Sequence, residues 1–390
     1  MPLSTAITKE MPQPLSLERM LTRLRTLVEI ESPSDDATAV NRAHDLVQIW
    51  AEQFGATITR HPQTDFGDVM ELSFARQIAA KPVMLLGHLD TVWPHGTLAK
   101  MPWRDAPDSE GRRRIWGPGT LDMKCGVIMA LEAVEVLQLS GRPMPPVILL
   151  LNPDEEVGSS ASRPYTERIA QECSTVFVME PAQGLNEGSY KTARKGIANY
   201  RIDVRGVASH SGVDFERGHS AVLELARLLL KVAAFTDRAT GLTVNPGVIG
   251  GGTRSNVIAA EAWAEVDVRI ARTADAEKVD AMFHALRCED AACSITISGG
   301  LNRPPMERSE GTARLFHQAQ TIAAELGFAL TEAATGGGSD GNFTAAVGTP
   351  TLDGMGPIGE GAHAAHESFL LDHLLPRTAL LMEMIAAQAE

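Results

Sequence analysis

Short apolar runs that lead directly into acids or a histidine constrain the fold of this 390-residue chain more than any other feature. Three such runs are Val83–Leu86, Val147–Leu151 and Val176–Met179. A helical pattern, Val127–Leu139, separates the first two runs. Strands that alternate with helices favour crossover connections and a parallel sheet. We therefore predict an α/β fold with a mixed, largely parallel sheet flanked by helices, at whose edge polar side chains gather.

The sequence pattern changes after residue 180, and a chain of 390 residues is longer than a single hydrophobic core usually accommodates. The next segment contains four strand-like runs and two helical patterns: Ala198–Arg205, Leu242–Ile249, Glu261–Ile270 and Ser294–Ser298, with Ala221–Ala234 and Ala274–Leu286. The first style resumes after Pro304 and Pro305 with a helical pattern at Ala313–Leu326. These changes predict an α+β domain of residues 194–304 inserted into a domain made of residues 1–193 and 305–390.

Composition narrows the class of protein. Hydrophobic residues make up 44% and charged residues 22% of the chain, which is typical of globular enzymes. A formal net charge of -14 argues against nucleic acid or an anionic membrane as a partner. No apolar run approaches the roughly 18 residues that span a bilayer, and the N-terminus shows no secretory signal pattern. We therefore expect a cytoplasmic protein without a membrane partner.

The four cysteines, Cys125, Cys173, Cys288 and Cys293, form neither a CxxC pair nor a dense framework. Reduced thiols are the expected state. A bridge between Cys288 and Cys293 is the alternative.

His88 and Asp90 follow the first apolar strand. Residues i and i+2 of a strand face the same side, so these two side chains should point together. Asp90 would accept the N–H of His88 and fix which ring nitrogen faces a metal. A histidine–aspartate pair in a polar turn is the simpler alternative.

Asp122 stands in a glycine-rich turn, residues 117–124, just ahead of the helix that starts near Val127. Glycines permit tight backbone geometry, so the turn can project a carboxylate towards neighbouring strand ends. The alternative is that Asp122 caps the helix. Lys124 and Cys125 are interpreted as structural.

Three acids, residues 154–156, follow the second apolar strand. They repel one another, and no cation lies near them in sequence, so a divalent cation would relieve them. A helix N-terminus also attracts acids, although this explains one or two acids better than three. Glu180 closes the third strand, and His363 lies in a small-residue loop far downstream.

Histidine and carboxylate side chains at the carboxyl ends of strands suit a zinc site. One metal would leave acids unused, so two metals that share one carboxylate use the set better. Three carboxylates against two Zn²⁺ leave one positive charge, which a hydroxide would neutralise. His366, three residues after His363, is an alternative last ligand.

Six sequence strings, in order along essentially the whole chain, carry a resemblance to a known family. They are residues 87–92, 117–124, 154–158, 179–181, 208–212 and 336–340. The chain resembles the co-catalytic di-zinc exopeptidases and deacylases, which include glutamate carboxypeptidases, aminoacylases, acetylornithine deacetylases and succinyl-diaminopimelate desuccinylases. Met179-Glu180-Pro181 and the Thr335–Asp340 string are most similar to the glutamate carboxypeptidase branch.

The resemblance implies two Zn²⁺ per subunit, with Co²⁺ or Mn²⁺ able to substitute. One zinc would be held by His88, Asp122 and Glu180, and the other by Asp122, Glu156 and His363. Glu155 would act as the general base for the bridging water. The inserted domain would be the family's lid and dimerisation domain, from which His210 would steady the oxyanion in a partner's active site.

Residues implied to hold a substrate carboxylate are Asn256, Arg269 and the loop Gly336, Gly337 and Gly338, whose N–H groups would face the anion. An ion pair of Arg269 with Asp267 or Glu265 is the alternative for the arginine. Ala259 stands where the family often has proline, which should change loop stiffness rather than chemistry.

The predicted activity is hydrolysis of an amide bond next to a free carboxylate, first as a carboxypeptidase that releases C-terminal glutamate or a similar amino acid. Deacylation of N-acyl amino acids is the second prediction. A serine hydrolase that uses Ser339 would leave the metal-type residues without a role. A non-catalytic binding protein that kept the fold is a further alternative, although every expected ligand and Glu155 are present.

Overall fold

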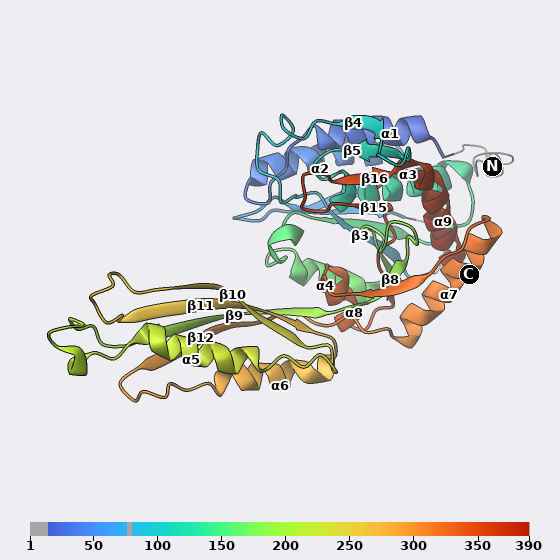
Figure 1. Cartoon of the computed structure of the whole chain (residues 1–390). Helices are drawn as coiled ribbons and strands as arrows, with labels where there is room; N and C mark the ends of the chain where they lie inside the picture. The colour runs from blue at the N-terminus through green and yellow to red at the C-terminus, as the bar shows by residue number, and fades with distance from the viewer. Residues whose placement is uncertain (1–14, 76–79, 390) are drawn as a thin grey trace. The chain divides into compact units, whose positions relative to one another are not determined.

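The computed structural model describes residues 15–75 and 80–389 and divides into two compact units (Figure 1). The first unit comprises Met1–Ala193, Arg308–Thr335 and Ser339–Glu390. The second comprises Arg194–Glu307 together with Gly336–Gly338. The sequence prediction had placed the second domain boundary after residue 304 and had assigned Gly336–Gly338 to the first domain. We call these units the catalytic unit and the inserted unit, and each is described by itself.

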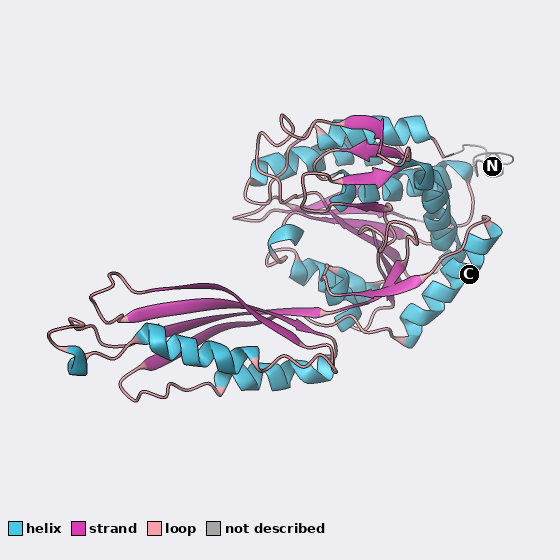
Figure 2. Cartoon of the chain, viewed as in Figure 1, coloured by secondary structure: helices cyan, strands magenta, loops and turns pink. Residues whose placement is uncertain are grey.

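A six-stranded mixed sheet forms the centre of the catalytic unit (Figure 2). Its order is β1 (Thr57–His61), β2 (Val69–Phe74), β6 (Val147–Asn152), β3 (Val83–His88), β7 (Thr175–Val178) and β14 (Thr351–Leu352). The four strands from β6 to β14 run parallel, and β2 is antiparallel to both of its neighbours, β1 and β6. The predicted α/β class with a mixed, largely parallel sheet is thus confirmed.

Helices cover both faces of this sheet, which explains why its central strands β6, β3 and β7 are largely continuous apolar runs rather than alternating ones. Leu85, on one face, packs with α1 (Leu17–Val28), α3 (Cys125–Ser140) and α9 (Leu374–Ala386). Met84 and Leu86, on the other face, pack with α4 (Arg163–Glu172). The remaining helices of the unit are α2 (Ala37–Glu52), α7 (Glu310–Glu325) and α8 (Gly341–Ala346).

The first two helices begin where side chains cap them. The Ser16 side chain accepts a hydrogen bond from the Arg19 N–H, and the Asp36 side chain accepts one from the Ala39 N–H. Between them, the predicted turn at residues 32–34 is present, and the Ser32 hydroxyl donates to the Leu89 carbonyl. This contact ties the helical start of the chain to the end of β3.

Two smaller sheets escaped sequence prediction. One contains β15 (Gly359–Glu360), β16 (Ser368–Leu370), β5 (Arg113–Trp116) and β4 (Arg104–Pro107) in that order, and the other pairs β13 (Glu332–Thr335) with β8 (Tyr190–Arg194). The first of these sheets matters for function. Its strand β5 leads into the loop of Asp122, while β15 and β16 flank the loop of His363.

The inserted unit is an antiparallel sheet in the order β10 (Thr243–Gly251), β11 (Glu261–Ile270), β9 (Gly196–Arg205) and β12 (Ser294–Arg303). The helices α5 (Ala221–Ala233) and α6 (Thr273–His284) share its hydrophobic core. All six predicted elements of this unit are present. The last strand is longer than predicted, because Gly299 and Gly300, which have positive φ, continue the pairing with β9 beyond Ser298.

Candidate metal centre

The parallel strands β6, β3 and β7 are neighbours, so their carboxyl ends meet at one edge of the sheet, where α/β proteins bind ligands. His88 is the last residue of β3. Glu155 and Glu156 begin a short 3₁₀ turn after β6, and Glu180 follows β7. The small sheet supplies Asp122 and His363. Five separate segments of the catalytic unit thus contribute to one cluster.

Asp122 lies between the two histidines. Its Oδ1 is 3.2 Å from His88 Nε2, and its Oδ2 is 3.5 Å from His363 Nε2. Each carboxylate oxygen therefore faces a different imidazole. A carboxylate that presents one oxygen to each of two ligand groups can bridge two metal ions.

Each histidine has a further carboxylate beside it. His363 Nε2 is 3.0 Å from Glu156 Oε2, and His88 Nε2 is 3.8 Å from Glu180 Oε1. Ligand atoms of His88, Asp122 and Glu156 lie within 4.8 Å of one another, as do those of His88, Glu155 and Glu180. His88 belongs to both groups, so the cluster is continuous.

Asp90 positions more than the sequence indicated. His88 Nδ1 is 3.0 Å from the backbone carbonyl of Asp90 and 3.3 Å from its Oδ1, so the ring nitrogen faces both oxygens. The Asp90 carboxylate also accepts hydrogen bonds from the N–H groups of Glu155 at 3.2 Å and Glu156 at 3.1 Å and from the Ser34 hydroxyl at 2.7 Å. One buried carboxylate therefore orients the imidazole and the two-glutamate turn together.

Burial and the neighbouring charged groups shift the pKa values of the cluster. Burial raises the pKa of Glu156 to about 7, although the hydrogen bond to His363 opposes this shift. Hydrogen bonds to Asp122 and Glu156 raise the pKa of His363 to about 10. Burial alone would lower the pKa of His88, but Asp122 and Asp90 raise it well above its usual value. A divalent cation displaces the protons of such groups on binding.

The donor set fits zinc. Imidazole nitrogens and carboxylate oxygens are its usual ligands alongside thiolates, and no cysteine among the described residues belongs to the two ligand groups. The buried thiol of Cys125 has a pKa well above its usual value because of burial, consistent with the structural role predicted for it. The carboxylates of the cluster lie close together, and their mutual repulsion is unfavourable without a compensating cation.

The three alternatives for the predicted ligands have no support among the described contacts. The N-cap position of α3 is Lys124, without a side-chain capping bond, so Asp122 does not cap that helix. The acids at 154–156 start a 3₁₀ turn rather than an α-helix, and the Asp154 side chain accepts the N–H of Ala161 at 2.7 Å. His363 and His366 are both exposed, but His363 Nε2 lies 3.5 Å from Asp122 Oδ2 and 3.0 Å from Glu156 Oε2.

The remaining predicted residues lie in the inserted unit. His210 is exposed, and its Nδ1 accepts hydrogen bonds from the N–H groups two and three residues on. Its loop is joined to Asn256 through the Ser211 N–H and the Asn256 carbonyl. Arg269 pairs with Asp267 at 2.9 Å, as the alternative had it, and its Nη1 also lies 3.4 Å from the Gly336 carbonyl. Arg269 and the glycine loop are therefore neighbours.

Gly337 and Gly338 are held by a second arginine that sequence reasoning did not single out. Arg194 Nη1 donates to the carbonyl oxygens of Gly337 and Gly338. Because these carbonyls are engaged by the arginine, the loop is fixed on that side.

Ser339 does not have the environment of a nucleophile. It is buried, and its hydroxyl donates to Asp353 at 2.6 Å and accepts from the Gly341 N–H at 3.1 Å. A nucleophilic serine needs a base beside it and access to substrate. The serine-hydrolase alternative has no structural support.

Two residues near the centre were missed by sequence reasoning. Glu367, four residues after His363, is buried beside the Asp122 loop, and Trp93 donates to it. The only sequence signal for Glu367 was an acid that directly follows a second histidine.

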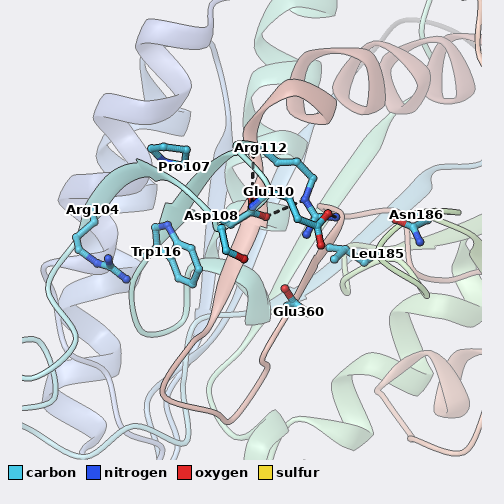
Figure 3. Close-up of a pocket in the computed structure, with 10 residues that line it drawn as sticks. Arg104, Pro107, Asp108, Glu110, Arg112, Trp116, Leu185, Asn186 and Glu360 are labelled. Carbon is cyan, nitrogen blue, oxygen red and sulfur yellow. Dashed lines mark hydrogen bonds and ion pairs between the residues drawn. The ribbon is translucent and has the colours of Figure 1, made fainter.

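A cavity of about 660 Å³ opens beside β4 and β5 (Figure 3). Asp108 there is bonded to Arg112, and the Arg104 guanidinium lies 4.8 Å from the centre of the Trp116 ring. None of the predicted site residues lines this cavity. We therefore assign the chemistry to the metal cluster.

Comparisons with known proteins identify the family. The model described as peptidase family M20/M25/M40 matches residues 84–387. This chain belongs to the M20/M25/M40 peptidase family. Carboxypeptidase G2 of Pseudomonas sp. (strain RS-16) is 30% identical over 387 residues, which cover 96% of this chain and 89% of that protein. Succinyl-diaminopimelate desuccinylase of Acidovorax ebreus is 28% identical, covering 77% of this chain and 78% of that protein.

Solved structures support the fold of this M20 chain. Aminopeptidase PepT of Bacillus cereus superposes with a TM-score of 0.79 at 20% identity, covering 96% of this chain and all of that one (100%). An M20 family metallo-carboxypeptidase of Sulfolobus solfataricus gives 0.71 at 16% identity, covering 94% and 99%. The predicted resemblance is confirmed, and the protein is a metallo-hydrolase of amide bonds. No helix among the described residues is long and apolar enough to cross a membrane.

Proposed function

We propose that this M20 protein is a di-zinc carboxypeptidase that releases C-terminal glutamate or a similar amino acid. His88, Asp122 and Glu180 would hold one Zn²⁺, and Asp122, Glu156 and His363 would hold the other. The observation that carries the proposal is the placement of the two Asp122 oxygens, each towards a different histidine. A single-metal site would leave one histidine and one glutamate without a role.

The residues of the chain divide the work by position. Bound zinc would supply a Lewis acid for the amide carbonyl and lower the pKa of a bound water. Glu155 would take a proton from that water and deliver it to the leaving nitrogen. Its backbone is held by the Asp90 carboxylate, which also holds the backbone of Glu156. Adjacent side chains can therefore serve different functions, one as base and one as ligand.

Substrate recognition would fall to the inserted unit. A released amino acid carries a carboxylate, and Arg269 beside the Gly336 loop offers a guanidinium and backbone N–H groups for it. His210 would donate to the oxyanion that forms at the scissile carbonyl. The ion pair of Arg269 with Asp267 preorients the guanidinium but also partly neutralises it.

Deacylation of N-acyl amino acids is the second candidate. The specific observation that favours it is the relative from Acidovorax ebreus, whose name describes a desuccinylase and which matches over 77% of this chain. Both reactions cleave an amide next to a free carboxylate, so the same metal centre serves either one.

A substrate panel separates the two candidates. Zinc-loaded protein would be assayed with dipeptides that end in glutamate, with dipeptides that end in other amino acids, and with N-acetyl and N-succinyl amino acids. We expect the highest kcat/KM for C-terminal glutamate and loss of all activity with a chelator. Faster cleavage of the N-acyl amino acids would replace the carboxypeptidase assignment with a deacylase. Activity that survives removal of the metal would refute both.

We further propose that the inserted unit mediates a homodimer. Apolar side chains are exposed on α5 at Leu223 and Leu230 and on the edge strand β10 at Val248 and Ile249. Leu230 is 76% exposed, and a neighbouring exposed strand edge can pair with another copy of the same strand. A second copy of the chain would cover the exposed apolar side chains and pair with the edge of β10 at the same time.

The test is the mass in solution measured by light scattering. Leu230→Asp combined with Ile249→Asp should convert a dimer to a monomer that keeps its circular dichroism. Leu139→Asp, at a leucine that is 50% exposed in the catalytic unit, is the matched control and should remain dimeric. A wild-type monomer, or a double variant that stays dimeric, would refute the proposed interface.

A further inference from the structure

Glu367 is a buried carboxylate that accepts several hydrogen bonds next to the metal cluster. The residue is 1% exposed and stands just before β16. Its Oε1 accepts from the N–H groups of Leu121 at 2.8 Å and Asp122 at 3.1 Å. Its Oε2 accepts from the Gly119 N–H at 2.8 Å and from the indole N–H of Trp93 at 2.7 Å. Four donors thus converge on one side chain.

These donors belong to segments that carry different parts of the metal centre. Three of them are backbone N–H groups of the loop that presents Asp122, namely those of Gly119, Leu121 and Asp122 itself. Trp93 belongs to the loop that follows His88 and Asp90. Glu367 therefore joins the bridging ligand to the loop after β3.

The backbone of Glu367 makes the third connection. Its N–H donates to the Ala364 carbonyl at 2.9 Å, and the Ala364 N–H donates to the Gly361 carbonyl at 2.8 Å, which closes the turn around His363. Its carbonyl accepts from the Gly117 N–H at 3.3 Å. Both histidine-bearing segments and the Asp122 loop are thus tied to this one residue.

Only a carboxylate satisfies all four donors. A glutamine of the same shape has one acceptor oxygen, and its NH₂ group would face N–H donors that it cannot bond. Leaving buried donors unpaired is costly, so the Asp122 loop would have to shift. Contacts of this kind, which orient metal ligands without touching the metal, are as much a part of a metal site as the ligands.

We infer that Glu367 is a positioning residue that sets the location of the bridging carboxylate relative to both histidines, and so controls metal affinity and turnover through Asp122. This inference rests on the proposed metal centre. It assigns to Glu367 a role in function beyond the stability that any buried, hydrogen-bonded acid supplies.

Three variants test it. Glu367→Gln removes the charge and half of the acceptors, and Trp93→Phe removes one donor while leaving Glu367 in place. Glu132→Gln is the matched control. Glu132 lies on helix α3, is also 1% exposed, and accepts hydrogen bonds from the Ser16 N–H and from the Arg19 side chain. The control should lose stability without any change at the metal centre.

The readouts are the zinc dissociation constants by chelator competition, the visible spectrum of the Co²⁺-loaded protein, and kcat and KM separately. For Glu367→Gln we expect zinc affinity and kcat each to fall about 10–100-fold, with an altered Co²⁺ spectrum. KM should change less than about threefold, because the substrate contacts are untouched. Trp93→Phe should shift the same three quantities in the same direction by less.

Wild-type values of zinc affinity and kcat and an unchanged Co²⁺ spectrum in Glu367→Gln would overturn the inference. If Glu367→Gln does not fold, an unchanged Co²⁺ spectrum in Trp93→Phe would overturn it equally, and a changed spectrum would support it. The wild-type protein separates this result from the proposed function. If the wild type fails to bind two metals, the metal centre itself is refuted, whatever the variants do.

Discussion

The adjacent glutamates 155 and 156 permit a direct test of the division between base and ligand. In Glu155→Gln the side chain keeps its shape but cannot accept a proton. The bonds that hold this turn, from the N–H groups of Glu155 and Glu156 to Asp90, involve only the backbone at these positions and survive the change. Glu156 should therefore stay 3.0 Å from His363 and zinc should stay bound.

The expected magnitude follows from the role. A positioned general base contributes about 10²–10⁴-fold, so kcat should fall by that factor, which corresponds to about 3–5 kcal/mol in the activation free energy. Zinc affinity should change less than about tenfold, since Glu155 is not among the proposed ligands. Glu156→Gln is the matched control, and it should lose one zinc per subunit.

Metal content by atomic absorption and steady-state kinetics on a glutamate-ending dipeptide measure both effects on the same preparations. Activity of Glu155→Gln within tenfold of wild type would refute its assignment as the base. Loss of zinc from Glu155→Gln equal to that from Glu156→Gln would refute the division between the two glutamates.

Three further predictions concern groups on which the account depends. Zinc added to metal-free protein at pH 7 should release about one to two protons per site, because Glu156 and His363 must both be deprotonated to bind metal. The pKa of Glu156 is raised to about 7 and that of His363 to about 10. An indicator dye in weak buffer measures the release, and no release would contradict the prediction. Ser339→Ala should keep activity within a few-fold. Its free energy of unfolding should fall by about 1–3 kcal/mol, because the buried Asp353 loses a hydrogen-bond donor. A variant that binds zinc but is inactive would support the serine-hydrolase alternative. Burial lowers the pKa of His44 to about 3 in the folded protein, so the unfolded chain binds this proton at a higher pH than the folded chain does. The contribution of His44 to the free energy of unfolding is therefore complete above about pH 6.5 and should fall by about 1.4 kcal/mol per pH unit below it. In metal-free protein, His44→Leu should remove that slope from denaturant unfolding curves, and equal slopes would contradict the prediction.

The positions of several proposed ligands at the edge of the sheet could be predicted, because a local sequence pattern precedes them. His88, Glu156 and Glu180 follow apolar strands that are buried on both faces, and such strands are visible as continuous runs. Asp122 is marked by the glycines before it. The family resemblance then supplied the order in which these segments combine.

The small sheet that carries the Asp122 and His363 loops could not be predicted. Its strands contain two to four residues, and β5 begins with two arginines rather than an alternating apolar pattern. Glu367 was missed for the same reason, since its importance lies in four donors from segments about 245 to 274 positions away in sequence, which no local pattern records. Tertiary hydrogen bonds of this kind are visible only in the structure.

The central claim is a pair of metal ions bridged by Asp122, and X-ray anomalous scattering at the zinc edge on crystals of the zinc-loaded protein tests it most directly. The account predicts two anomalous peaks about 3.5–4 Å apart, one beside His88 and one beside His363, each in contact with a different oxygen of Asp122. A single peak, or two peaks that do not share Asp122, would contradict it.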